Sequence, residues 1–367
     1  MAGIGPVPLA GLMLSELGAE VLRVERMSKE QAFLVVPDAY DLDRHGRSIV
    51  RIDLKRAEGV ELVLRLVGAA DCLIEGFRPG VMERLGLGPE VALDRNPGLV
   101  YGRMTGFGQD GPLAARAGHD LTYLALSGAL HAIGPRDGKP VPPLNLVADY
   151  GGGTMFLLVG LLAALLERGR SGKGQVIDAA MVDGASMLAA PFFAFLGAGF
   201  WKDRRGANLL DTGAPFYDTY ETADGRHVAV ACLEPQFFAE FARLLPLEPA
   251  LAQAQYDTSA WPQMRAAIAA RIAERNRDDW AALFENTDAC VAPVLSLAEA
   301  PAHGHARARD AHARIGPLTR PRPAPRFSRS PARLSQPPRT DPAEALAAFG
   351  ISAEDAETLA SAGIVGR

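Results

Sequence analysis

The sequence predicts an α/β protein with a Rossmann-like large domain, built on a parallel, doubly wound sheet, and a smaller α+β domain. Three observations predict this fold class. Apolar segments of strand and helix length alternate through the first 190 residues, which is the pattern of βαβ units. A hairpin pattern around Asp224-Gly225 follows after residue 200. The length of 367 residues suits about two domains.

The first segment has the order helix, then strand. Leu9, Leu12 and Met13 have helical spacing, Gly18 stands where a helix ends, and residues 19–24 suit a buried strand. Because a helix followed by a strand is only half of a βαβ unit, we expect a further strand before the first residue. The same patterns predict strands at 48–54, 70–75 and 99–105 and a helix at 58–67.

The rest of the large domain alternates in the same way. Residues 121–130 predict an apolar helix, and the proline-rich segment 141–146 is expected to be extended. Residues 154–168, after three glycines, predict a long buried helix. The segment 175–182 fits a strand or a helix equally well.

The smaller domain begins near residue 205. Residues 217–223 and 227–232 predict a hairpin, and helices are expected around 236–244, 261–272 and 278–284. Residues 301–340 hold nine arginines and eight prolines, which predicts either a solvated connector or an arm that returns to the first domain or wraps a partner. The domain boundaries we expect are 1–190 (large), 191–204 (linker), 205–300 (small), 301–340 (connector) and 341–367 (C-terminal helices returning to the large domain).

Composition excludes several classes of protein. The formal charge of −5 makes nucleic acid and anionic membranes unsuitable partners. Three scattered cysteines suit a reducing compartment, and the start of the chain has no secretory signal, so we expect a cytoplasmic location. The longest apolar run, residues 155–166, is too short to span a bilayer.

Two sequence motifs were tested and rejected. Residues 106–111 match G-x-G-x-x-G, but Pro112 follows and no acid lies about 20 residues on, so a nicotinamide site is not predicted. His303, His305 and His312 lie among arginines without a carboxylate or cysteine at ligand spacing, so no metal site is predicted.

Gly118-His119-Asp120 is the most informative short segment. Asp120 is a good N-cap for a helix from Leu121, which leaves His119 beside a helix N-terminus. The helix dipole there disfavours an imidazolium, so the neutral ring is available as a general base. The alternative is a histidine that only bonds a loop carbonyl.

Two acids are further candidates. Asp149 ends an apolar stretch and precedes three glycines, which allow a ligand to approach the backbone closely; the alternative is a helix-capping aspartate. Burial would raise the pKa of Asp149 and neighbouring N–H groups would lower it. Glu234 stands between a strand and a helix, and a capping or surface role explains it equally.

These residues lie in a set of short segments spread over nearly the whole chain. Through these segments, which occur in the same order, the chain resembles the α-methylacyl-CoA racemases of the family III CoA-transferase group. The matching segments are 2–6 (AGIGP), 23–26 (RVER), 53–55 (DLK), 75–80 (EGFRPG), 105–108 (TGFG), 118–120 (GHD), 143–146 (PLNL), 149–152 (DYGG), 172–178 (GKGQVID), 213–217 (GAPFY), 234–236 (EPQ) and 287–290 (TDAC).

The resemblance implies an interlocked homodimer with each active site between the large domain of one subunit and the small domain of the other. It implies that His119 and Asp149 are the two acid/base groups and that Glu234, from the partner chain, orients the histidine. It implies an acyl-CoA substrate in fatty acid metabolism and no cofactor or metal. The implied CoA contacts are Arg26, Ile52, Asp53, Leu54, Lys55, Gly118, Asp120, Leu121, Thr122 and Tyr123, with Arg78 and Arg84 added by position.

Two departures from the family pattern accompany the resemblance. The chain starts inside the motif that usually follows a first strand, and residues 27–46 are longer than usual near the expected CoA entrance. Two other functions stay open. A CoA transferase would use Asp149 as a nucleophile that forms a mixed anhydride. An inactive acyl-CoA-binding protein would keep the fold without a closed site.

Overall fold

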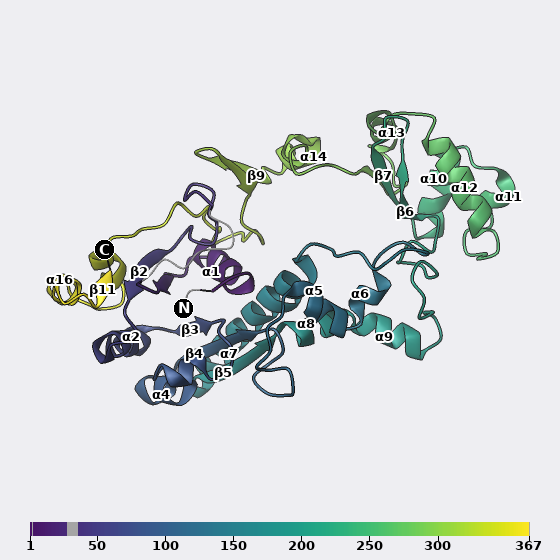
Figure 1. Cartoon of the computed structure of the whole chain (residues 1–367). Coiled ribbons are helices and arrows are strands. Elements are labelled where there is room, and N and C mark those ends of the chain that lie inside the picture. Colours follow the sequence, from purple (N-terminus) through teal and green to yellow (C-terminus); the bar gives the residue numbers. More distant parts are fainter. Residues whose placement is uncertain (2, 28–35, 367) are drawn as a thin grey trace. The chain divides into compact units, whose positions relative to one another are not determined.

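The structure, a computed structural model, describes residues 1, 3–27 and 36–366. The chain forms two compact units (Figure 1). Unit 1 comprises Met1–Ser127, Leu144–Ala189 and Ala308–Arg367, and unit 2 comprises Gly128–Pro143 and Ala190–Arg307. Residues 128–143, which the sequence analysis assigned to the large domain, therefore group with unit 2.

Unit 1 is α/β with two three-stranded sheets. In the first, β1 (Leu22–Glu25) pairs in parallel with β2 (Ser48–Ile52), and β11 (Val365–Gly366) pairs antiparallel with β2. In the second, β3 (Cys72–Glu75), β4 (Val100–Thr105) and β5 (Gln175–Ala180) are parallel in that order. The ambiguous segment after residue 175 is therefore a strand. The expected strand before the first residue lies outside the sequence and stays a prediction.

The helices of unit 1 connect and cover these strands. They are α1 (Pro6–Glu16), α2 (Ala57–Ala69), α3 (Val81–Arg84), α4 (Pro89–Arg95), α5 (Asp120–Leu126), η1 (Leu146–Met155), α7 (Phe156–Ser171), α8 (Met181–Leu188), α15 (Pro342–Ala347) and α16 (Ala353–Ser361). The short helix α14 (Gly304–Ala308) lies in unit 2 except for its last residue. Gly102 of β4 lies directly under α7, where an added Cβ would lie 2.9 Å from Leu157. The small residue thus lets α7 pack closely on the β3–β4–β5 sheet (Figure 1).

The π-helix η1 runs into α7 without a break. Together they form one helix from Leu146 to Ser171, whose most apolar window of 18 residues has mean hydropathy 1.6, so that it is long and apolar enough to cross a membrane. About 39% of its most apolar window is buried inside the structure, and the core helix of a soluble protein meets the same criterion. The absence of membrane binding stays a prediction.

The C-terminal segment returns to unit 1. After the hairpin of β9 (His312–Ile315) and β10 (Leu318–Pro321), the Arg320 guanidinium forms a buried ion pair with Glu16 of α1. Ser335 donates to the same carboxylate at 2.8 Å, and the Arg333 N–H donates to the Glu16 carbonyl at 2.8 Å. Of the alternatives for the arginine-rich stretch, the structure has the returning arm.

Unit 2 is α+β around an antiparallel sheet. The hairpin of β6 (Tyr217–Glu221) and β7 (His227–Ala231) is extended by β8 (Val291–Pro293), and its turn holds Gly225 at φ 72°. The helices are α6 (Ala129–Ala132), α9 (Ala190–Gly197), α10 (Pro235–Leu244), α11 (Pro249–Ala252), α12 (Trp261–Ile272), α13 (Arg277–Phe284) and η2 (Ala300–Ala302). Its core is aromatic, with Phe216, Phe238 and Phe241 almost fully buried.

Part of the long segment between β1 and β2 lies outside the description, because residues 28–35 are not among the described residues. Residues 38–47 form turns that pack against α1. Arg47 is 4% exposed and donates to the carbonyls of Pro8 and Asp43. The prediction that this segment lies near a CoA entrance is not tested.

Candidate active site

Asp149 lies inside the π-helix η1 and not before a helix. The segment Gly151–Gly153 was expected to admit a ligand, but these glycines are interior helical residues that face α8 and α1. A Cβ on Gly152 would overlap the backbone of Ala185, and one on Gly184 would overlap the carbonyl of Gly152. The glycines therefore allow η1 and α8 to pack backbone to backbone, and the expectation of close ligand approach at these glycines is wrong.

Asp120 joins the two segments that carry the predicted bases. The helix α5 begins at Asp120 with His119 as its N-cap, one residue earlier than predicted. The Asp120 carboxylate is not the cap because it reaches another helix: its Oδ2 accepts from the backbone N–H of Ala148 and of Asp149, each at 2.8 Å. These donors lie in the first turn of η1, where backbone N–H groups lack helical partners. The buried Asp120 thus fixes the start of η1 against the start of α5.

His119 is exposed at the start of α5. Its backbone N–H donates to the Thr122 hydroxyl at 3.0 Å, and that hydroxyl lies 2.7 Å from the His119 carbonyl. These local bonds fix the backbone of His119 and leave its imidazole at the surface of unit 1. The role of the imidazole, as a base or as a partner of a loop carbonyl, stays a prediction.

Asp149 has an elevated pKa for a physical reason that its neighbours supply. Burial raises the pKa of the carboxyl, a hydrogen bond from Asn145 Nδ2 to Asp149 Oδ2 at 3.3 Å lowers it, the Asp120 charge raises it and His119 lowers it. The net shift is upward. Asp120 and His119 are therefore near enough to Asp149 to influence its charge.

Tyr123 closes this environment from the side of α5. Its ring lies against Gly106 and Gly118, where any Cβ would overlap it, and it contacts Phe107 edge-on at 5.0 Å between centroids. Burial, together with the charges of Asp149 and Asp120, raises the pKa of Tyr123 to about 12, so the phenol is neutral and able to donate a proton in a hydrogen bond.

The predicted CoA residues of the first sheet follow the carboxyl ends of β1 and β2. Arg26 comes directly after β1 and is exposed, and Lys55 is exposed after β2. The Lys55 backbone N–H donates to Asp53 Oδ1 at 3.1 Å, and Leu54 packs partly on the core. Ile52 is 1% exposed within that core, so only its backbone is available to a ligand.

The remaining predicted residues lie at the carboxyl ends of the second sheet. Arg78 and Arg84 are exposed after β3, while Leu121 and Thr122 are exposed on the first turn of α5. In parallel α/β sheets, ligands bind at this edge. Arg78 therefore follows the strand edge where such sheets bind ligands, and the roles of the predicted CoA residues stay predictions.

Glu234 lies in unit 2. It is the exposed residue before α10. Burial, and to a lesser extent the charge of Glu234, raises the pKa of the nearby Cys290 thiol. Its predicted role toward His119 of a partner chain is not tested and stays a prediction.

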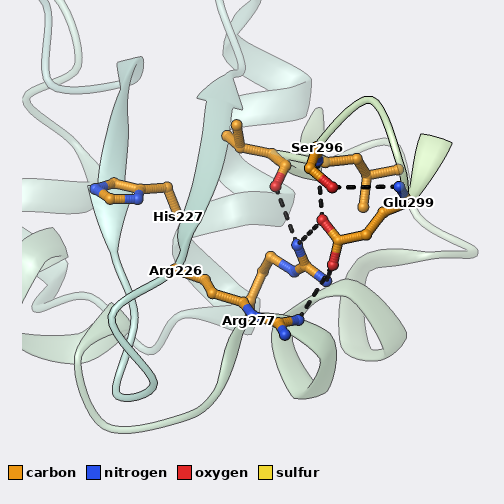
Figure 2. A pocket seen from close by; sticks show the side chains of 7 residues that line it. Arg226, His227, Arg277, Ser296 and Glu299 are labelled. Atoms are coloured by element: carbon orange, nitrogen blue, oxygen red, sulfur yellow. Dashed lines mark hydrogen bonds and ion pairs between the residues drawn. The ribbon is translucent and has the colours of Figure 1, made fainter.

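Unit 2 also holds an open cavity of about 610 Å³ that none of the predicted catalytic residues lines. Figure 2 shows the Arg277 guanidinium pointing toward the Glu299 carboxylate, with an N–O distance of 2.9 Å. Glu299 also accepts from the Ser296 N–H at 2.9 Å, and these bonds lower the pKa of Glu299 to about 2. The ion pair anchors the loop after β8, which is a structural explanation for this cluster.

Sequence reasoning missed two residues that touch the Asp149 carboxyl. Asn145, four positions earlier, donates to it, and only its place as a polar residue within an apolar stretch could have signalled this. Gly5 has φ 70° and lies so close that an added Cβ would be 3.3 Å from Asp149 Oδ2. Nothing in the local sequence around Gly5 indicated that it lies beside Asp149.

Comparison with known proteins supplies an independent line of evidence. The sequence profile of CoA-transferase family III matches residues 1–344. The chain is 44% identical to "Alpha-methylacyl-CoA racemase" of Mus musculus over 100% of this chain and 95% of that one. It is 40% identical, with the same coverage of each chain, to the protein of that name in Homo sapiens.

Among solved structures, a CAIB/BAIF family protein from Brucella suis superimposes with a TM-score of 0.77 at 28% identity and covers 95% of each chain. This likeness confirms the α/β fold class predicted from the sequence.

Proposed function

The chain belongs to CoA-transferase family III, as its sequence resemblance predicted, and from that premise we propose that it is an α-methylacyl-CoA racemase that interconverts 2R and 2S 2-methylacyl-CoA thioesters. One structural observation carries the proposal: the Asp120 carboxylate accepts from the Asp149 backbone N–H at 2.8 Å, so the start of η1, which carries Asp149, is held against the start of α5, which His119 caps. The full-length identity to proteins named as racemases supports it.

The reaction needs two acid/base groups on opposite faces of one carbon. One group removes the C2 proton of the thioester, an enolate forms, and the other group returns a proton to the opposite face. We assign these roles to His119 and Asp149. The raised pKa of Asp149 suits this work, because it keeps more of the carboxyl protonated near neutral pH and makes the carboxylate a stronger base when it is ionised.

Neither base removes this proton unaided, since an α-proton lies about a dozen pKa units above an imidazole, roughly 16 kcal/mol. Preorganised hydrogen-bond donors to the enolate oxygen supply about 3–4 kcal/mol each. The N–H groups at the start of α5 are the donors we assign, because those at Gly151–Gly153 lie in the interior of η1. No cofactor enters the proposed scheme.

The proposed assembly and environment follow the resemblance. We propose that the protein acts as an interlocked homodimer in which Glu234 of one chain orients His119 of the other, and that it works as a soluble cytoplasmic enzyme. A mixed dimer tests the first point: one chain carries Glu234→Ala and the other carries His119→Ala. Activity is recovered in the mixed dimer only if each site draws on both chains.

The second candidate, a CoA transferase, is favoured by the family itself. An experiment separates the two. The protein is incubated with a 2-methylacyl-CoA in D₂O, first alone and then with an isotopically labelled acceptor acid. The racemase exchanges the C2 proton without an acceptor and moves no label into the thioester. Label transfer that needs Asp149, without C2 exchange, would overturn the proposal, and binding without either reaction would indicate an inactive acyl-CoA-binding protein.

A further inference from the structure

A buried arginine in β4 is held by two carboxylates from the adjacent β3–α3 segment. Arg103 is 7% exposed, and its Nε lies 3.0 Å from Glu75 Oε1. Its Nη1 lies 2.8 Å from Glu83 Oε1, and Nη2 donates to Glu83 Oε2 at 3.3 Å. Glu75 and Arg103 are paired positions of the parallel strands β3 and β4, so their side chains start from adjacent places on the sheet.

The two carboxylates anchor a segment with two exposed arginines, Arg78 between them and Arg84 directly after Glu83. Glu75 ends β3, and its Oε2 accepts from the Phe77 N–H at 2.7 Å, which fixes the first bend after the strand. Glu83 lies in α3. The Arg84 side chain lies back over the start of α3: its Nη1 is 3.2 Å from the position that a Cβ on Gly80 would occupy. Arg103 therefore ties both ends of this segment to β4.

Stability alone does not account for such a cluster. A buried ion pair contributes little over apolar residues of similar volume, because removing charges from water offsets their attraction. Burial raises the pKa of Glu75 even though Arg103 and the Phe77 N–H favour its charged form, and the bonds to Glu83 and Glu75 raise the pKa of Arg103 against burial. The geometry instead fits a group that fixes the shape of an exposed segment.

The segment lies where a ligand is expected. It follows the carboxyl end of a parallel strand, the edge at which α/β sheets bind phosphorylated ligands. Arg78 and Arg84 are exposed there, and guanidinium groups bind phosphate bidentately when they are held in a fixed orientation.

We propose that Arg103 is a positioning residue for coenzyme A: it holds residues 76–84 in the conformation in which Arg78 and Arg84 bind the phosphates of the nucleotide end of the substrate. This inference rests on the proposed function for the identity of its ligand. Arg103 itself touches no substrate and acts through the Glu75 and Glu83 carboxylates.

The test compares a ligand that has the nucleotide with one that lacks it. The purified full chain and its Arg103→Met variant are titrated with free coenzyme A by calorimetry, and KM and kcat are measured for a 2-methylacyl-CoA and for the matching pantetheine thioester. We expect Arg103→Met to weaken coenzyme A binding about tenfold and to raise KM for the CoA ester in proportion, with kcat and the pantetheine ester unchanged. Arg103→Lys restores the charge without the planar fork and is expected to recover part of the affinity.

Two further variants keep the test decisive. Arg320→Met removes another buried arginine–glutamate pair of unit 1, on α1, and is expected to leave coenzyme A binding unchanged. Should Arg103→Met fail to fold, Glu83→Ala replaces it, because the Glu83 side chain is 44% exposed and its removal releases only one end of the segment.

The inference is overturned if Arg103→Met or Glu83→Ala binds coenzyme A like the unaltered protein, or if KM rises equally for the CoA ester and the pantetheine ester. It is also overturned if the unaltered protein does not bind coenzyme A. Coenzyme A binding without exchange at C2 would instead refute the proposed reaction and leave the role of Arg103 intact.

Discussion

Replacing Asp120 tests how the two predicted bases are held together. Its Oδ2 accepts two backbone N–H bonds from η1 at 2.8 Å, one of them from Asp149 itself. Bonds to a charged acceptor contribute about 1.5–3 kcal/mol each, so Asp120→Ala is expected to lower the free energy of unfolding by about 3–6 kcal/mol. It also frees the start of η1, and a displacement of Asp149 by about 1 Å costs about 10²-fold in rate.

The conservative variant Asp120→Asn separates geometry from charge. Its amide oxygen still accepts from η1, so we expect most of the stability and rate to return. Because the Asp120 charge raises the pKa of Asp149, removing that charge lowers this pKa, and the acidic limb of the rate profile moves to lower pH wherever Asp149 must be ionised.

The assay is the rate of C2 deuterium exchange against pH, with thermal unfolding followed by circular dichroism. Asp178→Asn is the matched control, since Asp178 accepts a backbone N–H from Gln109 at 2.9 Å elsewhere in unit 1. Wild-type rates and an unmoved acidic limb in both Asp120 variants would refute the reasoning.

Three other predictions concern single residues. His119→Ala and Asp149→Ala are each expected to lower epimerisation by at least 10²-fold while coenzyme A still binds, measured by chiral analysis and calorimetry; near-normal turnover in either would refute the two-base scheme. Asn145→Ala removes a bond that lowers the pKa of Asp149, so the acidic limb of the exchange rate should move to higher pH, and an unchanged or lowered limb would contradict this. Glu299 has a pKa lowered from 4.5 to about 2, so its contribution to the stability of the fold is complete above pH 4.5 and is lost as the pH falls toward 2. Glu299→Gln should remove this acid dependence from the melting temperature of unit 2. An identical pH dependence in the variant would show that Glu299 is not its source.

Local patterns predicted most elements of the fold. The apolar periodicity of α2 and the alternation of β6 and β7 agree closely with the structure, because both are set by residues a few positions apart. The break at Gly128, with φ 85°, split a helix that we expected to continue to residue 130. Nothing in residues 128–143 indicates that they group with unit 2, because that depends on contacts such as Arg136 with the Gly206 carbonyl, 70 positions away.

The candidate site shows the same division between local and distant information. Residue type and context made His119 and Asp149 candidates, and the resemblance implied their roles. Their link through Asp120 was not predicted, since it joins positions 28 and 29 apart. The glycines at 151–153 were misinterpreted because a flexible ligand loop and a close helix contact require the same residue. Gly184, which meets Gly152 across the α8–η1 contact, decides between the two only in three dimensions.

Exchange from each epimer separately is the most direct measurement of the two-base account. Pure 2R and pure 2S 2-methylacyl-CoA are incubated in D₂O with His119→Ala and with Asp149→Asn, and loss of the C2 proton is followed by NMR. If an imidazole and a carboxyl act on opposite faces, each variant loses exchange from one epimer and retains it from the other, in reciprocal fashion. Exchange of both epimers at wild-type rates in either variant, or loss from the same epimer in both, would contradict the account.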